Sequence, residues 1–191
     1  AHVAPTFNEK AVGPAMGFAN NLGQEASVVG TIICGDNYFN ENLEASLEFI
    51  KDVMDKVNPD IVVAGPAFNA GRYGMACAGV AKFVTEKYNI PVVTGMYEEN
   101  PGLDACKSIA YVVPTSNVAS AMGKALPVMA KLTLKLLNGE VVKPLVDGYF
   151  AQGKRLTVIS DKIGAVRATD MLMKRLKGEE FETELPMPVF D

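Results

Sequence analysis

The sequence has no tryptophan, a single histidine at position 2 and only three cysteines. Cys34, Cys77 and Cys106 lie far apart and form no C-x-x-C pair, so a zinc site of the usual cysteine and histidine type is excluded. The odd number of cysteines and the lack of disulfide-type spacing favour a reducing compartment. We expect each thiol to behave as a small, buried, apolar side chain.

The sequence also lacks excess positive charge and long apolar runs. Its formal net charge is −4 and it has no basic stripe to bind phosphates, so we expect no nucleic acid partner. No apolar stretch approaches the ~20 residues of a membrane span and no signal-peptide pattern opens the chain, which predicts a cytoplasmic protein without membrane attachment. The 191 residues that are present, 49% of them hydrophobic, are typical of one globular domain with a large core.

Apolar runs alternate with helical patterns along the chain and predict an α/β fold. Continuous β-branched runs at 28–34, 61–64, 90–94 and 110–113 are typical of strands that are covered on both faces. With the helical spacing between them, strongest over 42–57, they predict a doubly wound, mostly parallel sheet with helices on both faces, of the Rossmann-like or flavodoxin-like kind. The other expected elements are helices at 14–23, 116–136 (kinked or interrupted at Pro127) and 165–176, and a short strand at 156–159.

Three of the predicted strands end in a glycine and continue into a loop with an aromatic residue and asparagine. These first, second and third loops comprise residues 35–42, 65–74 and 95–102. The carboxyl ends of parallel strands meet at one edge of a sheet, where open α/β folds form their ligand crevice. We therefore expect the three loops to converge on a binding site.

The second loop ends in the most informative motif, Asn69-Ala70-Gly71-Arg72-Tyr73-Gly74. A helix start with free backbone N–H groups favours an anion, and Arg72 has the geometry to bind a carboxylate through two hydrogen bonds. The structural alternative is a tight turn whose Arg72 pairs with a surface acid. The motif is neither a Walker loop nor a G-x-G-x-x-G, so it gives phosphate binding no specific support.

The first and third loops contribute aromatic and acidic side chains. Helix capping explains part of the polarity of the first loop, but the pair Tyr38-Phe39 is typical of the wall of a small-molecule pocket. In the third loop Glu98 and Glu99 are placed to meet a cationic ligand or to act as general acid and base, unless they form a solvated acidic turn. The candidate substrate-binding residues are Asp36, Tyr38, Asn42, Asn69, Arg72, Tyr73, Tyr97, Glu98, Glu99 and Asn100.

These loops resemble the selenoprotein subunit of component B of the glycine, sarcosine and betaine reductases. The resemblance covers nearly the whole chain, in long consecutive matches that are more specific than a short motif. The matching stretches are Glu9-Lys10-Ala11-Val12-Gly13-Pro14, residues 33–42, 65–74 and 94–102, Ala125-Leu126-Pro127-Val128-Met129-Ala130-Lys131, Glu179-Glu180-Phe181 and Leu185-Pro186-Met187-Pro188.

The resemblance implies an oxidoreductase that cleaves a C–N bond of a small amino acid, or of its N-methylated form such as betaine. In this family a selenocysteine attacks the carbon next to the carboxylate and expels the amine. A partner subunit supplies a pyruvoyl group in the glycine type, and a carrier selenoprotein accepts the carboxymethyl group. The resemblance places the selenocysteine in a second domain beyond the equivalent of Asp191, and none of the three cysteines matches the redox motif of the family.

From the residues and the resemblance together, we expect residues 1–178 to be an N-terminal substrate-binding domain, without its first strand, and 179–191 to be an extended linker towards the selenocysteine domain. Such a chain would hold no cofactor and no catalytic residue, would be inactive alone, and would assemble into an oligomer. Arg72 and the backbone of 69–73 would hold the carboxylate, while Tyr38, Tyr97 and one glutamate flank the amine. The alternatives are a non-catalytic small-molecule-binding module and a scaffold for subunit contact.

Overall fold

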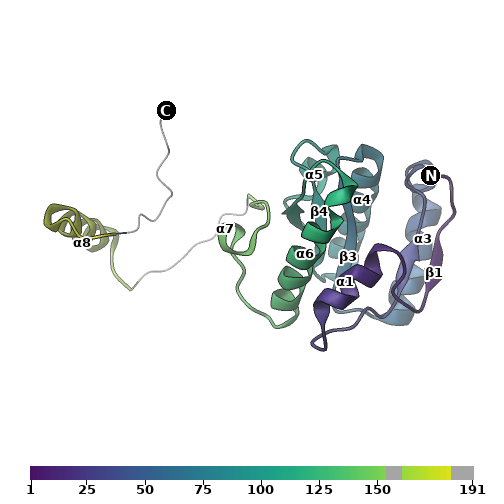
Figure 1. The fold of residues 1–191 in the computed structure, drawn as a ribbon, viewed down its shortest axis with the longest axis horizontal. Coiled ribbons are helices and arrows are strands. Elements are labelled where there is room, and N and C mark those ends of the chain that lie inside the picture. Colours follow the sequence, from purple (N-terminus) through teal and green to yellow (C-terminus); the bar gives the residue numbers. More distant parts are fainter. Residues whose placement is uncertain (154–160, 182–191) are drawn as a thin grey trace. The chain divides into compact units, whose positions relative to one another are not determined.

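A computed structural model describes residues 1–153 and 161–181. The chain forms two compact units, Ala1–Lys154 and Arg155–Asp191, and each is described by itself. The elements of the first unit, in order, are β1 (Thr6–Asn8), α1 (Pro14–Leu22), β2 (Thr31–Ile33), α2 (Asp36–Glu41), α3 (Leu43–Val57), β3 (Val62–Phe68), α4 (Gly71–Tyr88), β4 (Val92–Met96), α5 (Pro101–Cys106), β5 (Tyr111–Pro114), the 3-10 turn η1 (Ala119–Ala121), α6 (Met122–Leu137) and α7 (Pro144–Asp147) (Figure 1).

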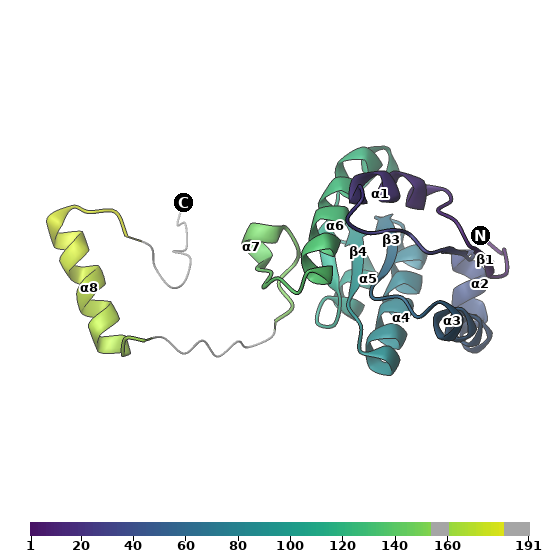
Figure 2. The same ribbon diagram turned by 90° about the horizontal axis from the view of Figure 1, so that it is seen from below.

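A three-stranded parallel sheet of order β3-β4-β5 lies at the centre of this unit. Successive side chains of a strand face opposite sides of the sheet. Val92 accordingly packs with residues of α3, α4 and α5, whereas Val93 packs with residues of α1 and α6. Figure 2 shows these two helical layers on either face of β3 and β4. The α/β class is thus confirmed, but the sheet is smaller than the doubly wound sheet that the sequence predicts.

The run at 28–34 does not form the first strand of the parallel sheet, and that prediction was wrong. Its extended part, β2, pairs antiparallel with β1, a strand that was not predicted from the sequence. A side chain at position 30 would overlap the ring of Phe7, so Gly30 allows the close approach of the N-terminal segment. A continuous β-branched run indicates a strand covered on both faces but does not identify the neighbouring strand, which here comes from the N-terminal segment.

Most of the predicted helices are present, with shifted boundaries. The amphipathic helix expected over 42–57 is α3, and Asn58 ends it in the left-handed conformation (φ 48°). One expectation was wrong, because residues 36–41 of the first loop form the short helix α2. Helix α6 is not interrupted at Pro127, and the 3-10 turn η1 stands in place of its expected first residues.

The second unit contains α8 (Gly164–Lys177), which confirms the predicted helix and ends at Gly178 with φ 70°. Lys162 Nζ lies 2.6 Å from Asp170 Oδ2 in this unit. The strand expected at 156–159 and most of the linker expected at 179–191 lie outside the described residues. Among the described helices, none combines the length and the apolar character needed to cross a membrane.

Candidate functional site

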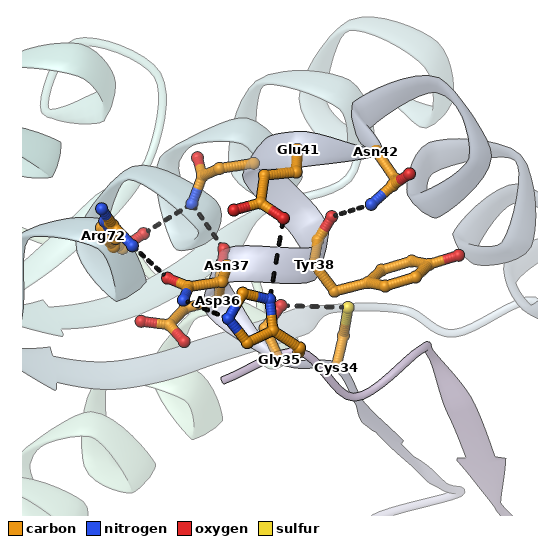
Figure 3. A network of polar contacts seen from close by, with 10 residues as sticks. Cys34, Gly35, Asp36, Asn37, Tyr38, Glu41, Asn42 and Arg72 are labelled. Atoms are coloured by element: carbon orange, nitrogen blue, oxygen red, sulfur yellow. Dashed lines mark hydrogen bonds and ion pairs between the residues drawn. The ribbon is translucent and has the colours of Figure 1, made fainter.

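The first and second loops are joined by hydrogen bonds between α2 and the first turn of α4. Arg72 Nη1 donates to Asn37 Oδ1 over 2.6 Å, and Asn40 Nδ2 donates to the Arg72 carbonyl over 3.1 Å (Figure 3). Neither Asn37 nor Asn40 is among the site residues predicted from the sequence, where Asn40 was interpreted as a helix-capping candidate. These two residues nevertheless make the hydrogen bonds that join the first loop to the second.

Asn100 joins the second loop to the third. Its side-chain nitrogen donates to the carbonyls of Phe68 (2.8 Å) and Ala70 (3.3 Å), while its Oδ1 accepts from the backbone N–H of Gly102 (2.9 Å) and so caps α5. The residue is only 2% exposed. Both N–H donors of the amide and its carbonyl are thus engaged within the protein, which gives Asn100 a positioning role at the junction of the two loops.

The backbone at this junction is unusual in two respects. Phe68 has a φ of 49°, a left-handed conformation that is a genuine outlier for a bulky residue, and its carbonyl is held by Asn100 and by the Tyr97 N–H (3.0 Å). Two glycines let α4 and α5 approach each other closely. A Cβ at Gly74 would overlap the Asn100 amide, and a Cβ at Gly102 would overlap the Gly74 backbone.

Arg72 is exposed in the first turn of α4, the helix that begins at Gly71. Its partner is the neutral side chain of Asn37, not the surface acid of the structural alternative. This hydrogen bond uses only part of the guanidinium, which carries several N–H donors in a planar fork. The first-turn N–H groups of a helix also lack partners within the helix. The arrangement presents an oriented cation beside a helix start, where a carboxylate is favoured.

The other candidates of the first two loops do not all lie beside Arg72. Figure 3 shows the Tyr38 ring pointing away from Arg72, and Asn42 Nδ2 donates to the Tyr38 carbonyl over 3.1 Å. Asp36 begins α2. Tyr73 is 36% exposed, and burial raises the pKa of its phenol, with smaller contributions from Cys77 and Asp36. Tyr73 is therefore an uncharged hydrogen-bonding group at neutral pH.

The acidic part of the third loop faces solvent. Glu98 and Glu99 are exposed in a turn after the half-buried Tyr97, and neither forms an ion pair with any described residue. Asn69 of the second loop is exposed as well. These side chains are available to a ligand, but nothing within the described protein orients them towards Arg72.

The three thiols are held in their protonated form. Burial raises the pKa of Cys34, and the Asp36 carboxylate adds to this effect while Ser46 opposes it. Burial raises the pKa of Cys77 to about 12 and that of Cys106 to about 11. Because the thiolate is the nucleophilic form of cysteine, the site has no activated thiol among these residues. No cluster of potential metal ligands occurs in the described parts of the chain.

The fold and the site together define an α/β protein whose second and third loops follow the parallel strands β3 and β4, at the edge where open α/β sheets bind their ligands, with the first loop hydrogen-bonded to the second. Residues 1–191 match the family described as glycine/sarcosine/betaine reductase selenoprotein B. The chain belongs to this family, and the resemblance seen in the sequence is confirmed.

Individual relatives come from all three reductase types. The chain is 48% identical over 192 residues to the sarcosine reductase complex component B subunit beta of Peptoclostridium acidaminophilum. It is 50% identical over 192 residues to the glycine reductase complex component B subunit gamma of Carboxydothermus hydrogenoformans, and 42% identical over 194 residues to the betaine reductase complex component B subunit beta of P. acidaminophilum. Each alignment covers 100% of this chain and 44% of the relative, so the chain spans less than half the length of these proteins. No solved structure matches the chain.

Proposed function

We propose that residues 1–191 form the substrate-binding part of a reductase component B, for the reductive cleavage of the C–N bond of glycine, sarcosine or betaine. The observation that supports this most is the anchored Arg72. A guanidinium held by Asn37 at the start of α4 supplies a cation with defined direction for a carboxylate, the group that the three substrates share.

In this proposal the carboxylate accepts hydrogen bonds from Arg72 and from the first backbone N–H groups of α4. The amine end of the substrate, which is cationic in all three compounds, then extends towards Tyr97, Glu98 and Glu99. The exposed carboxylates attract the positive charge, and an aromatic face also suits the quaternary amine of betaine. Asn100 holds the third loop against the second through its hydrogen bonds to the Phe68 and Ala70 carbonyls, and in this proposal the ligand itself orients the exposed glutamates.

The family resemblance assigns the bond-breaking step to a selenocysteine and, in the glycine type, to a pyruvoyl group on a partner subunit. The sequence of residues 1–191 contains no selenocysteine, and the protonated thiols of Cys34, Cys77 and Cys106 are unsuited to replace it. The contribution of this chain is to bind and orient the substrate. The partner subunit and the carrier selenoprotein that the resemblance implies would complete the enzyme.

The kinetic test is Arg72→Ala in the assembled reductase. Loss of a charge-assisted hydrogen bond to the carboxylate is expected to raise KM about 10- to 100-fold, because one such bond contributes about 1.5–3 kcal/mol. Arg72→Lys keeps the charge but not the planar fork and should recover only part of the affinity. Arg175→Ala, on the separate helix α8, is the matched control and should leave KM unchanged. An unchanged KM in Arg72→Ala refutes the carboxylate assignment.

A further inference from the structure

A cavity of about 510 Å³ lies beside the parallel sheet, between the β2 segment and β3. Residues 29–34 line it on one side and residues 62–65 on the other. Helices of both layers line it as well. Met54 of α3 and Val84 of α4 come from one layer, and Phe18 of α1 and Leu126 of α6 come from the other. The cavity thus has a strand segment on each side and helices above and below, which is the environment of a strand within a layered α/β sheet.

Both neighbouring strands have a free edge facing this cavity. In the described part of the chain, β3 pairs only with β4, and β2 pairs only with β1. The Val62 N–H donates to the Pro91 carbonyl on the β4 side (3.2 Å). Since the N–H and C=O groups alternate between the two edges of a strand, those of Val63 are directed to the opposite, unpaired edge. A strand edge of this kind is a template for pairing with another strand.

Among the described residues, the exposure of paired positions shows that β3 has a neighbouring strand on one side only, whereas β4 has one on each side. Val62 and Val63 are only half-buried, whereas their partners in β4, Val92 and Val93, are completely buried. On the other side of the cavity, the apolar Ile33 is 44% exposed. In addition, Thr133 Oγ1 of α6 is buried at the cavity without a described hydrogen-bond partner.

The dimensions of the cavity fit a short length of extended chain. With a strand spacing of about 4.8 Å, a layer thickness of about 10 Å and a rise of about 3.3 Å per residue, one strand residue takes up about 160 Å³. A volume of 510 Å³ therefore holds about three enclosed residues, comparable to the three residues of β2. Because apolar helices cover both faces, an occupying strand must be apolar on both faces as well.

We propose that this cavity is the seat of an apolar β-strand that the same polypeptide supplies from outside residues 1–191, and that it joins β2 to β3 in one continuous sheet. The relatives are more than twice as long as the matched region, since the chain covers 44% of each, so a cis strand has an available source. Cys34 and Gly65 line the cavity at the point where the first and second loops begin, so the proposed strand would lie next to the elements that carry both loops.

Two native cysteines allow the occupancy of the cavity to be measured. Cys34 lines the cavity and is half-buried, whereas Cys106 is fully buried, does not line it and serves as the control. We would compare residues 1–191 with the full-length polypeptide by the rate of modification with methyl methanethiosulfonate, read by mass spectrometry, and by amide hydrogen exchange. Val93, which pairs within the sheet, is the exchange control for Val63.

In the full-length polypeptide, we expect the modification of Cys34 and the amide hydrogen exchange of Val63 to be at least about tenfold slower than in residues 1–191. The corresponding rates for Cys106 and Val93 should be unchanged. Equal rates for Cys34 and Val63 in the two forms would overturn the proposal. Protection that appears already in residues 1–191 and grows with their concentration would also overturn it, because the occupant would then be a second copy. No substrate is involved, so this outcome is independent of the carboxylate assignment for Arg72.

Discussion

Replacing Asn100 by alanine tests the argument that this residue holds the second and third loops together. The substitution removes three hydrogen bonds, to Phe68, Ala70 and Gly102. The Phe68 carbonyl keeps the Tyr97 N–H as a donor and the Ala70 carbonyl keeps the Gly74 N–H, so neither is left without a partner. The buried N–H of Gly102 loses its cap. At about 1 kcal/mol for each hydrogen bond, we expect a loss of about 3 kcal/mol in the free energy of unfolding.

The assay is urea unfolding followed by far-UV circular dichroism, which suits a chain without tryptophan. For a domain of this size, the expected loss corresponds to a decrease of about 6–12 °C in Tm. Asn42→Ala is the control, because Asn42 is exposed and its side chain makes one hydrogen bond, to Tyr38; we expect a change below about 0.5 kcal/mol. A loss of less than about 1 kcal/mol in Asn100→Ala, with an unchanged m value, would refute the proposed role.

Three further predictions concern packing, ionisation and the anchoring of Arg72. Gly74→Ala is expected to lower the free energy of unfolding by about 1–3 kcal/mol because its Cβ would overlap a buried amide, whereas Gly123→Ala, with open space around its Cβ, should have no such cost. Burial raises the pKa of Cys77 from 9.0 to about 12, so its contribution to the free energy of unfolding is complete below pH 9 and is lost as pH rises towards 12. The urea midpoint should therefore fall less steeply between pH 9 and 11 in Cys77→Ala than in the unmodified protein. An unaltered slope would contradict this. Asn37→Ala frees the Arg72 side chain and should raise KM in the assembled reductase about 2- to 10-fold, less than Arg72→Ala does.

Local patterns were sufficient to predict much of the fold. Helix α3 was predictable because its apolar residues repeat at helical intervals and Asn58-Pro59 follows, and α8 because a glycine lies just after its last apolar residue. The strands of the parallel sheet were predictable because their apolar runs lie between turn residues. In contrast, the pairing of β2 with β1 depends on a contact between segments about 25 residues apart. Such pairing leaves no periodic signal in either segment.

The site was predictable only in outline. The second and third loops converge as their positions after β3 and β4 indicate, whereas the first loop follows β2, which lies outside the parallel sheet. The contacts that join the loops run from Asn37 to Arg72 and from Asn100 to Phe68, over more than 30 residues in each case. An asparagine that bridges two loops and one that caps a helix look alike in a sequence. For the same reason, the sequence did not distinguish Asn100, which is fully engaged by the protein, from Asn69, which is exposed.

Substrate-dependent hydrogen exchange of intact component B tests the central claim most directly. The enzyme would be measured at saturating glycine, sarcosine and betaine, and without substrate, by mass spectrometry of peptides. The account predicts slower exchange, with the preferred substrate, in peptides that cover residues 35–42, 69–74 and 97–102, and unchanged exchange in α8. Protection elsewhere in an enzyme that turns over its substrate, with unchanged exchange in all three loops, would contradict it.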